Sequence, residues 1–510
     1  MPKSIHDGLE FPPKIDRLVL LVIFTIFSIL VLPQLFVERL WPDEALYLWY
    51  AKNITGSFAF SFSAQAVEFH PPLFPTLIAI FGKLFHVHEQ MSAQFLSWGW
   101  ALGALIAIGG LGSRFGGPAA GSVACILLCF NPVFIKYANK IVPDVPQMVI
   151  TICLVWAILK REEASESTPM TGMIWMITCT LILLKWSGLL ALFFVGAANF
   201  YPAKEFSWKK SILRAMRDVS VPGFLSLILF FNNWRLWNSF FPPHWKTLAA
   251  TSLWEKIFIL NDSEILLGHP WLLFLAVLGL GFLWTKRQWY LFWLAFLWVI
   301  VFGIGTGFIS PFMDLRYGLL VVPVFIILAA ISINGGIALF LSARPQLVLP
   351  CQYILVILLL FSFLWKSSQY AAILAEDNKF FKGFSPAADC IHQYWTKETA
   401  VLATSSRQIR YATGIEFAAF GGTLVEFPWE KEELLRMIEQ NPYPMIVELD
   451  NWGSGGLPRF DPGQLKDQGF MASEGFQLIQ EIGWMIYKDE KGKSYRAPAM
   501  WIFYRGKAKN

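Results

Sequence analysis

Long apolar segments recur through the first three quarters of this 510-residue chain and limit what it can fold into more than any other feature. Charged residues make up about 11% of residues 1–375, against about 25% from Glu376 to Asn510, the usual share in soluble domains. The mean hydropathy of the whole chain is +0.50. These values exclude a disordered, collagen-like or disulfide-scaffold protein. They indicate a large membrane domain followed by a soluble domain.

A helix that crosses a bilayer needs about 20 mostly apolar residues. We predict a polytopic α-helical membrane protein with about 11 to 13 transmembrane helices and a C-terminal soluble α/β domain. The domains are residues 1–368 and 369–510. The eleven candidate spans are residues 18–37, 90–112, 118–135, 145–159, 170–185, 188–202, 219–237, 269–285, 289–309, 316–341 and 347–366.

Lys and Arg residues in the short loops predict the orientation, because they favour the cytoplasmic side. Pro72–Phe85 is apolar but spans 14 residues, about 21 Å of helix, so we interpret it as an interfacial or re-entrant helix. The predicted cytoplasmic segments then hold 14 Lys and Arg in 57 residues, and the external short loops hold nine in 104. Residues 38–89 become one long external loop, and the C-terminal domain is extracytoplasmic.

The first external loop carries two polar clusters among apolar and aromatic residues. Asp43 and Glu44 follow Pro42, which suits the first turn of a helix, and the helix dipole favours negative charge there. Simple helix capping is the alternative reading of this pair. The second cluster contains Glu68 and His70, just before a Pro-Pro pair.

Further charged residues fall on the same predicted external side. Asp144 opens one membrane helix, Lys185 lies at the end of another, and Arg316-Tyr317 begins a third. His244 lies in a later external loop. Each could be a capping or snorkelling residue taken alone. Together they suit an enzyme that acts on a lipid phosphate, with a carboxylate as general base and cations on the phosphate leaving group.

The set of motifs resembles the GT-C superfamily of polyprenyl-phosphate-sugar-dependent glycosyltransferases, in the branch of the protein O-mannosyltransferases and lipid A aminoarabinose transferases. The resemblance covers roughly residues 15–365. The matching motifs are Asp43-Glu44, His70-Pro71-Pro72, Pro143-Asp144, Leu184-Lys185-Trp186-Ser187-Gly188 and Arg316-Tyr317.

The resemblance implies transfer of a sugar from a polyprenyl-phosphate-linked donor to an acceptor hydroxyl on a lipid, a glycan or a protein, with inversion at the anomeric carbon. It implies Asp43 as general base, Glu44 as its support and Asp144 on the acceptor or metal side. The candidates for binding the donor phosphate are His70, Lys185, Arg316 and Tyr317.

Some members of the superfamily bind a divalent metal, so the resemblance makes a metal a candidate cofactor here. His244, Glu68 and Asp43 are conceivable ligands, although no ligand spacing supports the set. The basic excess of the membrane part is a topology signal, so we expect no nucleic-acid partner.

The C-terminal domain is expected to be a small α/β layer. Ser385-Pro386 favours a helix start, and residues 428–440 have the pattern of an amphipathic helix. The expected strands are residues 400–404, 417–420, 445–449, 477–482, 484–487 and 500–504. Residues 451–456 are expected to form a flexible connection.

Three alternatives stay open at this point. A polytopic transporter would place charges near the bilayer midplane and often shows internal repeats, whereas these charges gather at one interface. A non-catalytic scaffold would tolerate changes at Asp43 and Asp144. A lipid-linked oligosaccharide ligase would differ in the size of its donor. We expect an integral membrane protein of a bacterial or archaeal plasma membrane rather than the endoplasmic reticulum.

Overall fold

The computed structural model describes seventeen stretches of the chain, separated by gaps. They are residues 17–35, 40–57, 71–138, 140–163, 168–201, 207–237, 270–305, 315–359, 361–362, 384–418, 422–428, 431–440, 444–450, 469–482, 485–488, 494–498 and 500–506. The contacts divide the chain into two compact units. The helical unit comprises Met1–Leu35 and Ala59–Ala371, and the C-terminal unit comprises Phe36–Phe58 and Ala372–Asn510.

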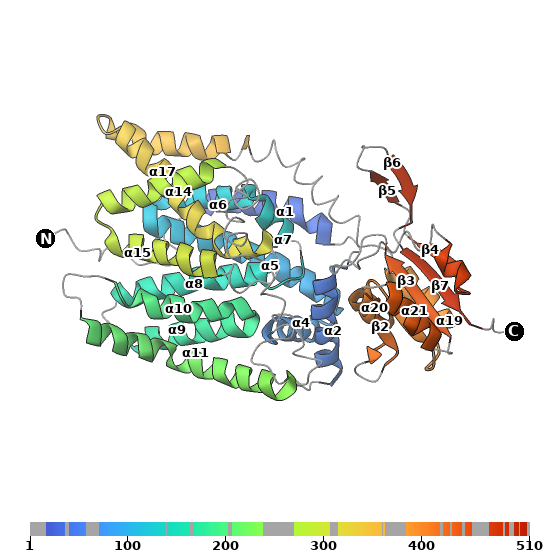
Figure 1. The fold of residues 1–510 in the computed structure, drawn as a ribbon. Helices are drawn as coiled ribbons and strands as arrows, with labels where there is room; N and C mark the ends of the chain where they lie inside the picture. The colour runs from blue at the N-terminus through green and yellow to red at the C-terminus, as the bar shows by residue number, and fades with distance from the viewer. Residues whose placement is uncertain are drawn as a thin grey trace. The chain divides into compact units, whose positions relative to one another are not determined.

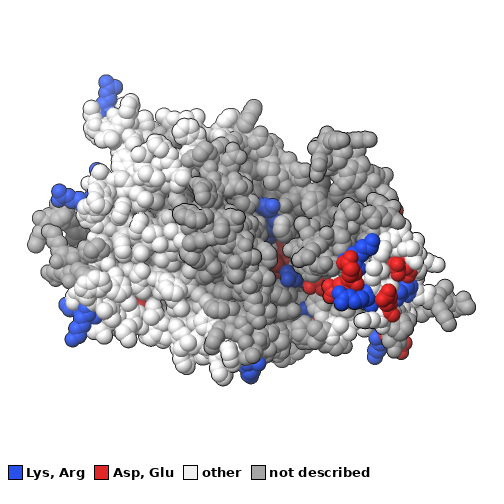
Figure 2. Space-filling view, in the orientation of Figure 1, with Lys and Arg blue, Asp and Glu red and all other residues white. Residues whose placement is uncertain are grey.

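The helical unit is built from apolar helices that lie alongside one another (Figure 1). The helices are α1 (Arg17–Leu35), α4 (Leu73–Phe85), α5 (Glu89–Gly116), α6 (Pro118–Phe130), α7 (Pro132–Ala138), α8 (Asp144–Glu163), α9 (Thr168–Leu184), η1 (Trp186–Leu189), α10 (Leu190–Ala198), α11 (Trp208–Trp237), α14 (Pro270–Thr285), α15 (Trp289–Trp298), η4 (Val299–Ile304), η5 (Leu315–Leu320), α17 (Val322–Phe340) and η6 (Pro345–Leu347). Among its packed pairs are α5 with α6, α8 with α9, and α14 with α17. Among the described residues visible in the space-filling view, few in this unit are charged, and charges gather over the C-terminal unit (Figure 2).

Within the described residues, ten of the eleven predicted spans coincide with one or two of these helices, and the last, residues 347–366, is helical at residues 348–359 and 361–362. Two of them, α5 and α17, are long and apolar enough to cross a membrane, or three if α6 and α7 form one bent span. Pro72–Phe85 is the short helix α4, as predicted. The number of passes stays a prediction.

Local sequence signals explain where several helices break. Gly117 has φ of +88°, a backbone conformation that disfavours side chains, and it separates α5 from α6. The side chain of Asn131 accepts a hydrogen bond from Phe134 N at 2.9 Å, and Pro132 is the first residue of α7. This Asn-Pro pair caps α7 and splits the segment that the sequence predicted as one span.

The C-terminal end of α8 is linked to α10 and α11 by a buried polar network. The Arg161 guanidinium pairs with Asp218, which is fully buried. The side chain of Asn199 donates to Asp218 Oδ2 at 2.9 Å and accepts from Arg161 Nη2 at 3.1 Å. Since buried ions need partners, we interpret this network as a structural tie between the three helices.

The C-terminal unit contains a mixed five-stranded sheet in the order β2-β1-β3-β7-β4, in which β1, β2 and β3 are parallel. Its core includes buried side chains of the sheet and of helices α21 (Lys431–Gln440) and α23 (Phe470–Ser473). The strands are β1 (Ala400–Ala403), β2 (Leu424–Glu426), β3 (Met445–Asp450), β4 (Gln477–Ile482) and β7 (Met500–Arg505), with β5 (Met485–Lys488) and β6 (Ser494–Ala497) as a separate antiparallel pair. The helices are α2 (Pro42–Ser57), α19 (Phe384–Tyr394), α20 (Ser406–Thr413), α21 (Lys431–Gln440) and α23 (Phe470–Ser473).

Most predicted elements of this unit are confirmed, including the helix start near Ser385 and strands β1, β3, β4, β5 and β7. The strand predicted near residues 417–420 is not found at the described residues 417 and 418, because Phe417 makes only an isolated bridge to Leu424 and the strand beside β1 is Leu424–Glu426. Residues 419 and 420 lie outside the described residues. Aromatic and apolar residues at 417–420 resemble a strand locally, but the pairing with β1 selects the later residues. Residues 451–456 lie outside the described residues.

The helix that follows the first predicted span belongs to the C-terminal unit. The sequence assigned residues 38–89 to the membrane domain as one external loop, whereas the contacts of α2 group Phe36–Phe58 with residues 372–510. In particular, α2 packs against α20. The side chains of α2 are therefore positioned by residues more than 340 positions later in the chain.

Candidate active site

The start of α2 holds both carboxylates of the Asp43-Glu44 pair. Pro42 is the first residue of the helix, and Asp43 and Glu44 lie in its first turn, as the sequence predicted. Glu44 is fully buried, and its Oε2 accepts a hydrogen bond from Trp41 N at 2.9 Å. This is the glutamate half of a capping box, which satisfies one backbone donor at the helix start. Glu44 therefore fixes the first turn and with it the position of Asp43.

Asp43 pairs with a cation from α20. Nη1 of Arg407 lies 3.2 Å from Oδ1 of Asp43, with 34% and 20% of the two side chains exposed. Arg410, one turn later on the same face of α20, is buried, and its Cζ lies 4.7 Å from the Trp49 ring centroid. These contacts fix α2 on α20 and leave Asp43 partly accessible.

A second cluster lies in the helical unit, where α8 begins. Asp144 is the first residue of α8, and its Oδ1 accepts a hydrogen bond from Lys185 Nζ. The exposed fractions of the two side chains are 3% and 10%. Asp144 Oδ2 has no hydrogen-bond partner within the described ranges. Asp144 thus neutralises a buried cation with one carboxylate oxygen. Within the described ranges its other carboxylate oxygen, Oδ2, is an unused hydrogen-bond acceptor.

A second side-chain pair fixes the same junction. Gln147 lies one turn into α8, and its Nε2 donates a hydrogen bond to Oγ of Ser187, in η1, at 2.9 Å. Lys185 itself is extended, with φ of −159° and ψ of 146°, between the end of α9 and η1. The break in the helix therefore turns Lys185 toward α8.

Gly188 makes this tight break sterically feasible. A Cβ atom at Gly188 would overlap the backbone of Leu181 and Ile182 in α9. We expect Gly188→Ala to lower the free energy of unfolding by about 1–3 kcal/mol through overpacking, and to reduce activity by displacing Lys185. The matched control is Gly172→Ala in α9, where a Cβ meets nothing within 4 Å. Thermal unfolding of both variants in detergent tests this, and equal melting temperatures would contradict it.

Tyr317 brings the cations of this cluster together. Lys185 Nζ lies 4.6 Å and Arg316 Cζ 5.4 Å from the centroid of its ring. Both residues of the Arg316-Tyr317 pair belong to η5, which packs against α8 and α7. Lys140, four residues before Asp144, is also buried and lies 4.9 Å from the Tyr137 ring centroid. The segments around the start of α8 thus supply three cationic side chains and one carboxylate.

The structure brings together part of the predicted set. Asp144, Lys185, Arg316 and Tyr317 form one cluster in the helical unit, and Asp43 and Glu44 lie together in the C-terminal unit. Glu68, His70 and His244 lie outside the described residues. The roles assigned to all of these residues stay predictions.

Sequence reasoning missed Arg407, Lys140, Gln147 and Ser187. A signal existed for Lys140, a charge inside the apolar stretch before Asp144, and for Ser187, which stands within the lysine motif. Nothing local marked Arg407, because α20 reads as an ordinary amphipathic helix of a soluble domain.

The described residues do not by themselves form a divalent-metal site. They contain no group of three His, Cys, Asp or Glu side chains, and the neighbour of Asp43 on α20 is the cation Arg407. Since a metal centre needs several anionic or neutral donors, the described donor set does not fit one, and we derive no step through a metal.

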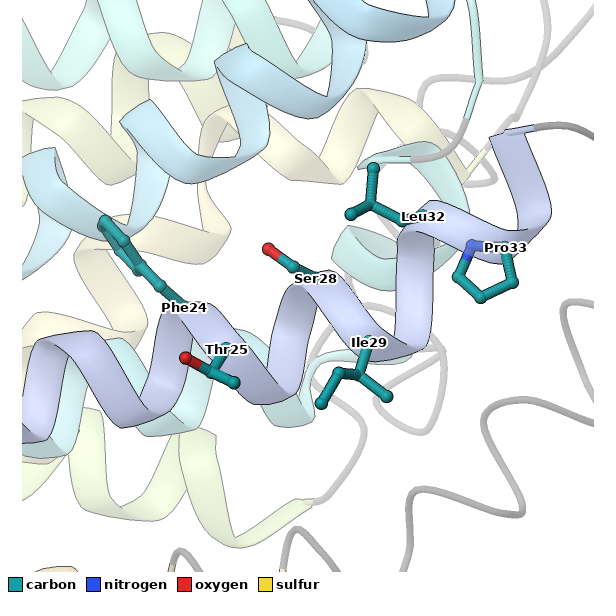
Figure 3. Close-up of a pocket in the computed structure, with 6 residues that line it drawn as sticks. All are labelled: Phe24, Thr25, Ser28, Ile29, Leu32 and Pro33. Carbon is teal, nitrogen blue, oxygen red and sulfur yellow. The ribbon is translucent and has the colours of Figure 1, made fainter.

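A groove along α1 does not contribute to either cluster. It has a volume of about 530 Å³, and the described residues that line it all come from α1 (Figure 3). They are Phe24, Thr25, Ser28, Ile29, Leu32 and Pro33, none of them charged.

Comparisons with known proteins identify the fold. Neither a scan against protein-family models nor a search of curated proteins finds a match. Among solved structures, ArnT from Cupriavidus metallidurans bound to undecaprenyl phosphate is similar, with a TM-score of 0.60, 12% identity, and coverage of 96% of this chain and 98% of that chain. The oligosaccharyltransferase of Archaeoglobus fulgidus in complex with Zn and sulfate has a TM-score of 0.59 and 12% identity, with coverage of 94% of this chain and 73% of that chain. The chain therefore shares the overall fold of these two proteins.

Proposed function

We propose that this protein is a membrane glycosyltransferase that transfers a sugar from a polyprenyl-phosphate-linked donor to an acceptor hydroxyl. The observation that carries the proposal is the buried Lys185, which is held by Asp144 and shares the Tyr317 ring with Arg316, in a chain of the GT-C fold. Such a cluster of cations suits a lipid phosphate, because buried cations interact strongly with an anion in a site of low dielectric.

Solved structures of the same fold support the class of donor. ArnT of Cupriavidus metallidurans was solved with undecaprenyl phosphate, and AglB of Archaeoglobus fulgidus with an inhibitory peptide and a dolichol-phosphate. These ligands share one chemistry, a phosphate on a long polyprenyl chain. We propose a ligand of this chemistry for our chain.

The proposed reaction is a single displacement at the anomeric carbon. The acceptor oxygen forms a bond to that carbon while the bond from the carbon to the phosphate oxygen breaks, so the configuration inverts. Asp43 takes the acceptor proton as general base, and Glu44 fixes the turn that carries it. Lys185 and Arg316 stabilise the negative charge on the leaving phosphate, with His70 as a further candidate.

The experiment uses the purified full-length protein in lipid nanodiscs and a panel of radiolabelled polyprenyl-phosphate sugars with lipid, glycan and peptide acceptors. We expect one donor to yield labelled product and free polyprenyl phosphate, which mass spectrometry identifies. Nucleotide sugars serve as the control and should not react. If no polyprenyl-phosphate sugar is cleaved by protein that binds it, the proposal is wrong.

An oligosaccharide ligase is the second candidate, and the similarity to the archaeal oligosaccharyltransferase favours it. It differs from the first in donor size, so the panel includes lipid-linked oligosaccharides. A transporter, another of the alternatives, would move the lipid-linked sugar across sealed vesicles without cleaving it.

A further inference from the structure

The contact between α2 and α20 joins the predicted first external loop to the C-terminal domain through three pairs of side chains. Three residues on one face of α20, at spacings of three and four, meet three residues of α2. Arg407 contacts Asp43, Arg410 lies over Trp49, and Lys52 Nζ lies 5.9 Å from the Tyr411 ring centroid. The three contacts follow the same order along both helices.

Arg410 is a buried anchor of this contact. Its guanidinium is buried between the rings of Trp49 and Phe417, at 4.7 and 4.9 Å from their centroids. It also pairs with Glu416 at 2.6 Å. A desolvated guanidinium between two aromatic rings is worth about 2 kcal/mol or more. Docking of α2 therefore has a buried anchor besides the partly exposed pair between Arg407 and Asp43, and pairs near the surface are typically worth about 1 kcal/mol or less in stability.

We infer that Arg407 is a positioning residue for the general base: it holds the Asp43 carboxylate ionised and in one orientation for the acceptor proton. The inference rests on the proposed function, in which Asp43 is that base. Two constraints act on the carboxylate. Glu44 fixes the backbone of its turn, and Arg407 fixes the carboxylate at Oδ1. The C-terminal domain thus supplies part of the catalytic apparatus in addition to any role in acceptor binding.

The charge of Arg407 has two expected consequences. A cation beside a carboxylate favours its ionised form, which is the form that accepts a proton. A fixed carboxylate also keeps the base aligned with the acceptor proton. A misplacement of about 1 Å can cost about a hundredfold in rate. Among the described residues, the other charged and titratable groups at this contact include Arg410 with its partner Glu416, Lys52, Tyr411 and, on the same turn as Asp43, Glu44.

The test replaces Arg407 in the full-length protein and measures kcat, the KM of the donor and the pH profile. We expect Arg407→Met, which keeps the aliphatic stem, to lower kcat about ten- to a hundredfold with the donor KM nearly unchanged. The acid limb of the kcat profile should move to higher pH by about one unit. Arg407→Lys should restore most of kcat and the position of that limb. Lys52→Gln, which removes a cation from the same contact, should stay within about twofold of the unmodified protein.

A folding measurement separates positioning from a structural role. Cys390 lies in the C-terminal unit, and burial raises the pKa of its thiol to about 11. Maleimide labelling of Cys390, followed by mass spectrometry, should therefore be slow in folded variants and fast in unfolded ones. If Arg407→Met does not fold, Arg407→Gln is judged by the same criteria.

Two results would overturn the inference while the proposed function stands. One is an Arg407→Met enzyme within about twofold of normal kcat. The other is an activity loss that matches the unfolded fraction, with the acid limb in place. An active Asp43→Asn variant would instead overturn the assignment of the base itself.

Discussion

Asp43→Asn should lower kcat for sugar transfer by about 10²- to 10⁴-fold, the usual contribution of a general base. The amide has nearly the shape of the carboxylate but cannot take up the acceptor proton. The donor KM should change little, since Asp43 is assigned to the acceptor side of the reaction. Initial rates with the radiolabelled donor that reacts in the panel measure both kcat and the donor KM.

Asp389→Asn is the matched control for this variant. Asp389 is an exposed carboxylate on α19 of the same unit, and its loss should leave kcat unchanged. The Asn variant at Asp43 also loses its ion pair with Arg407, so the labelling of Cys390 should be compared between the two variants. Turnover close to normal by folded Asp43→Asn protein would exclude Asp43 as the base.

The buried pair of Asp144 and Lys185 should respond to single and double replacement in opposite ways. Removing one partner leaves an uncompensated buried charge, so Asp144→Leu alone should reduce the free energy of unfolding by about 3–5 kcal/mol. The double replacement Asp144→Leu with Lys185→Met removes both charges and should recover most of that loss. Because the double variant no longer has the cation proposed for the donor phosphate, its transfer activity should stay low. Thermal unfolding in detergent and donor turnover measure the two effects.

The network at the other end of α8 offers a matched control pair. Arg161 and Asp218 are as deeply buried, and Asp218→Leu alone should cost a similar amount of stability. The double replacement Arg161→Met with Asp218→Leu should recover both stability and activity, because this pair is not assigned to the donor. A fully active Asp144→Leu, Lys185→Met double variant would show that the pair near η1 is structural as well.

Local patterns predicted a large part of the fold. The apolar segments became helices, and the charged C-terminal region became an α/β layer, because burial of apolar side chains and strand patterning are properties of neighbouring residues. The exceptions follow the same logic. Residues 417–420 have the composition of a strand, but sheet register depends on β1, which no local signal reveals. The break at Asn131 depends on one capping side chain within an otherwise continuous apolar segment.

The candidate site also has features that the local sequence predicted and features that only the packing decided. The sequence by itself marked Asp43, Asp144, Lys185 and Arg316, since charges at the ends of apolar helices are costly and stand out from their surroundings. Only the tertiary structure decided which of them are paired and by what. Lys185 meets Asp144 across 41 positions, and Arg407 meets Asp43 across 364, in a unit that the sequence had assigned to a different domain from α2. The sequence shows the chemistry of each side chain. The partner of that side chain depends on how helices distant in the sequence pack together, and neighbouring residues do not predict that packing.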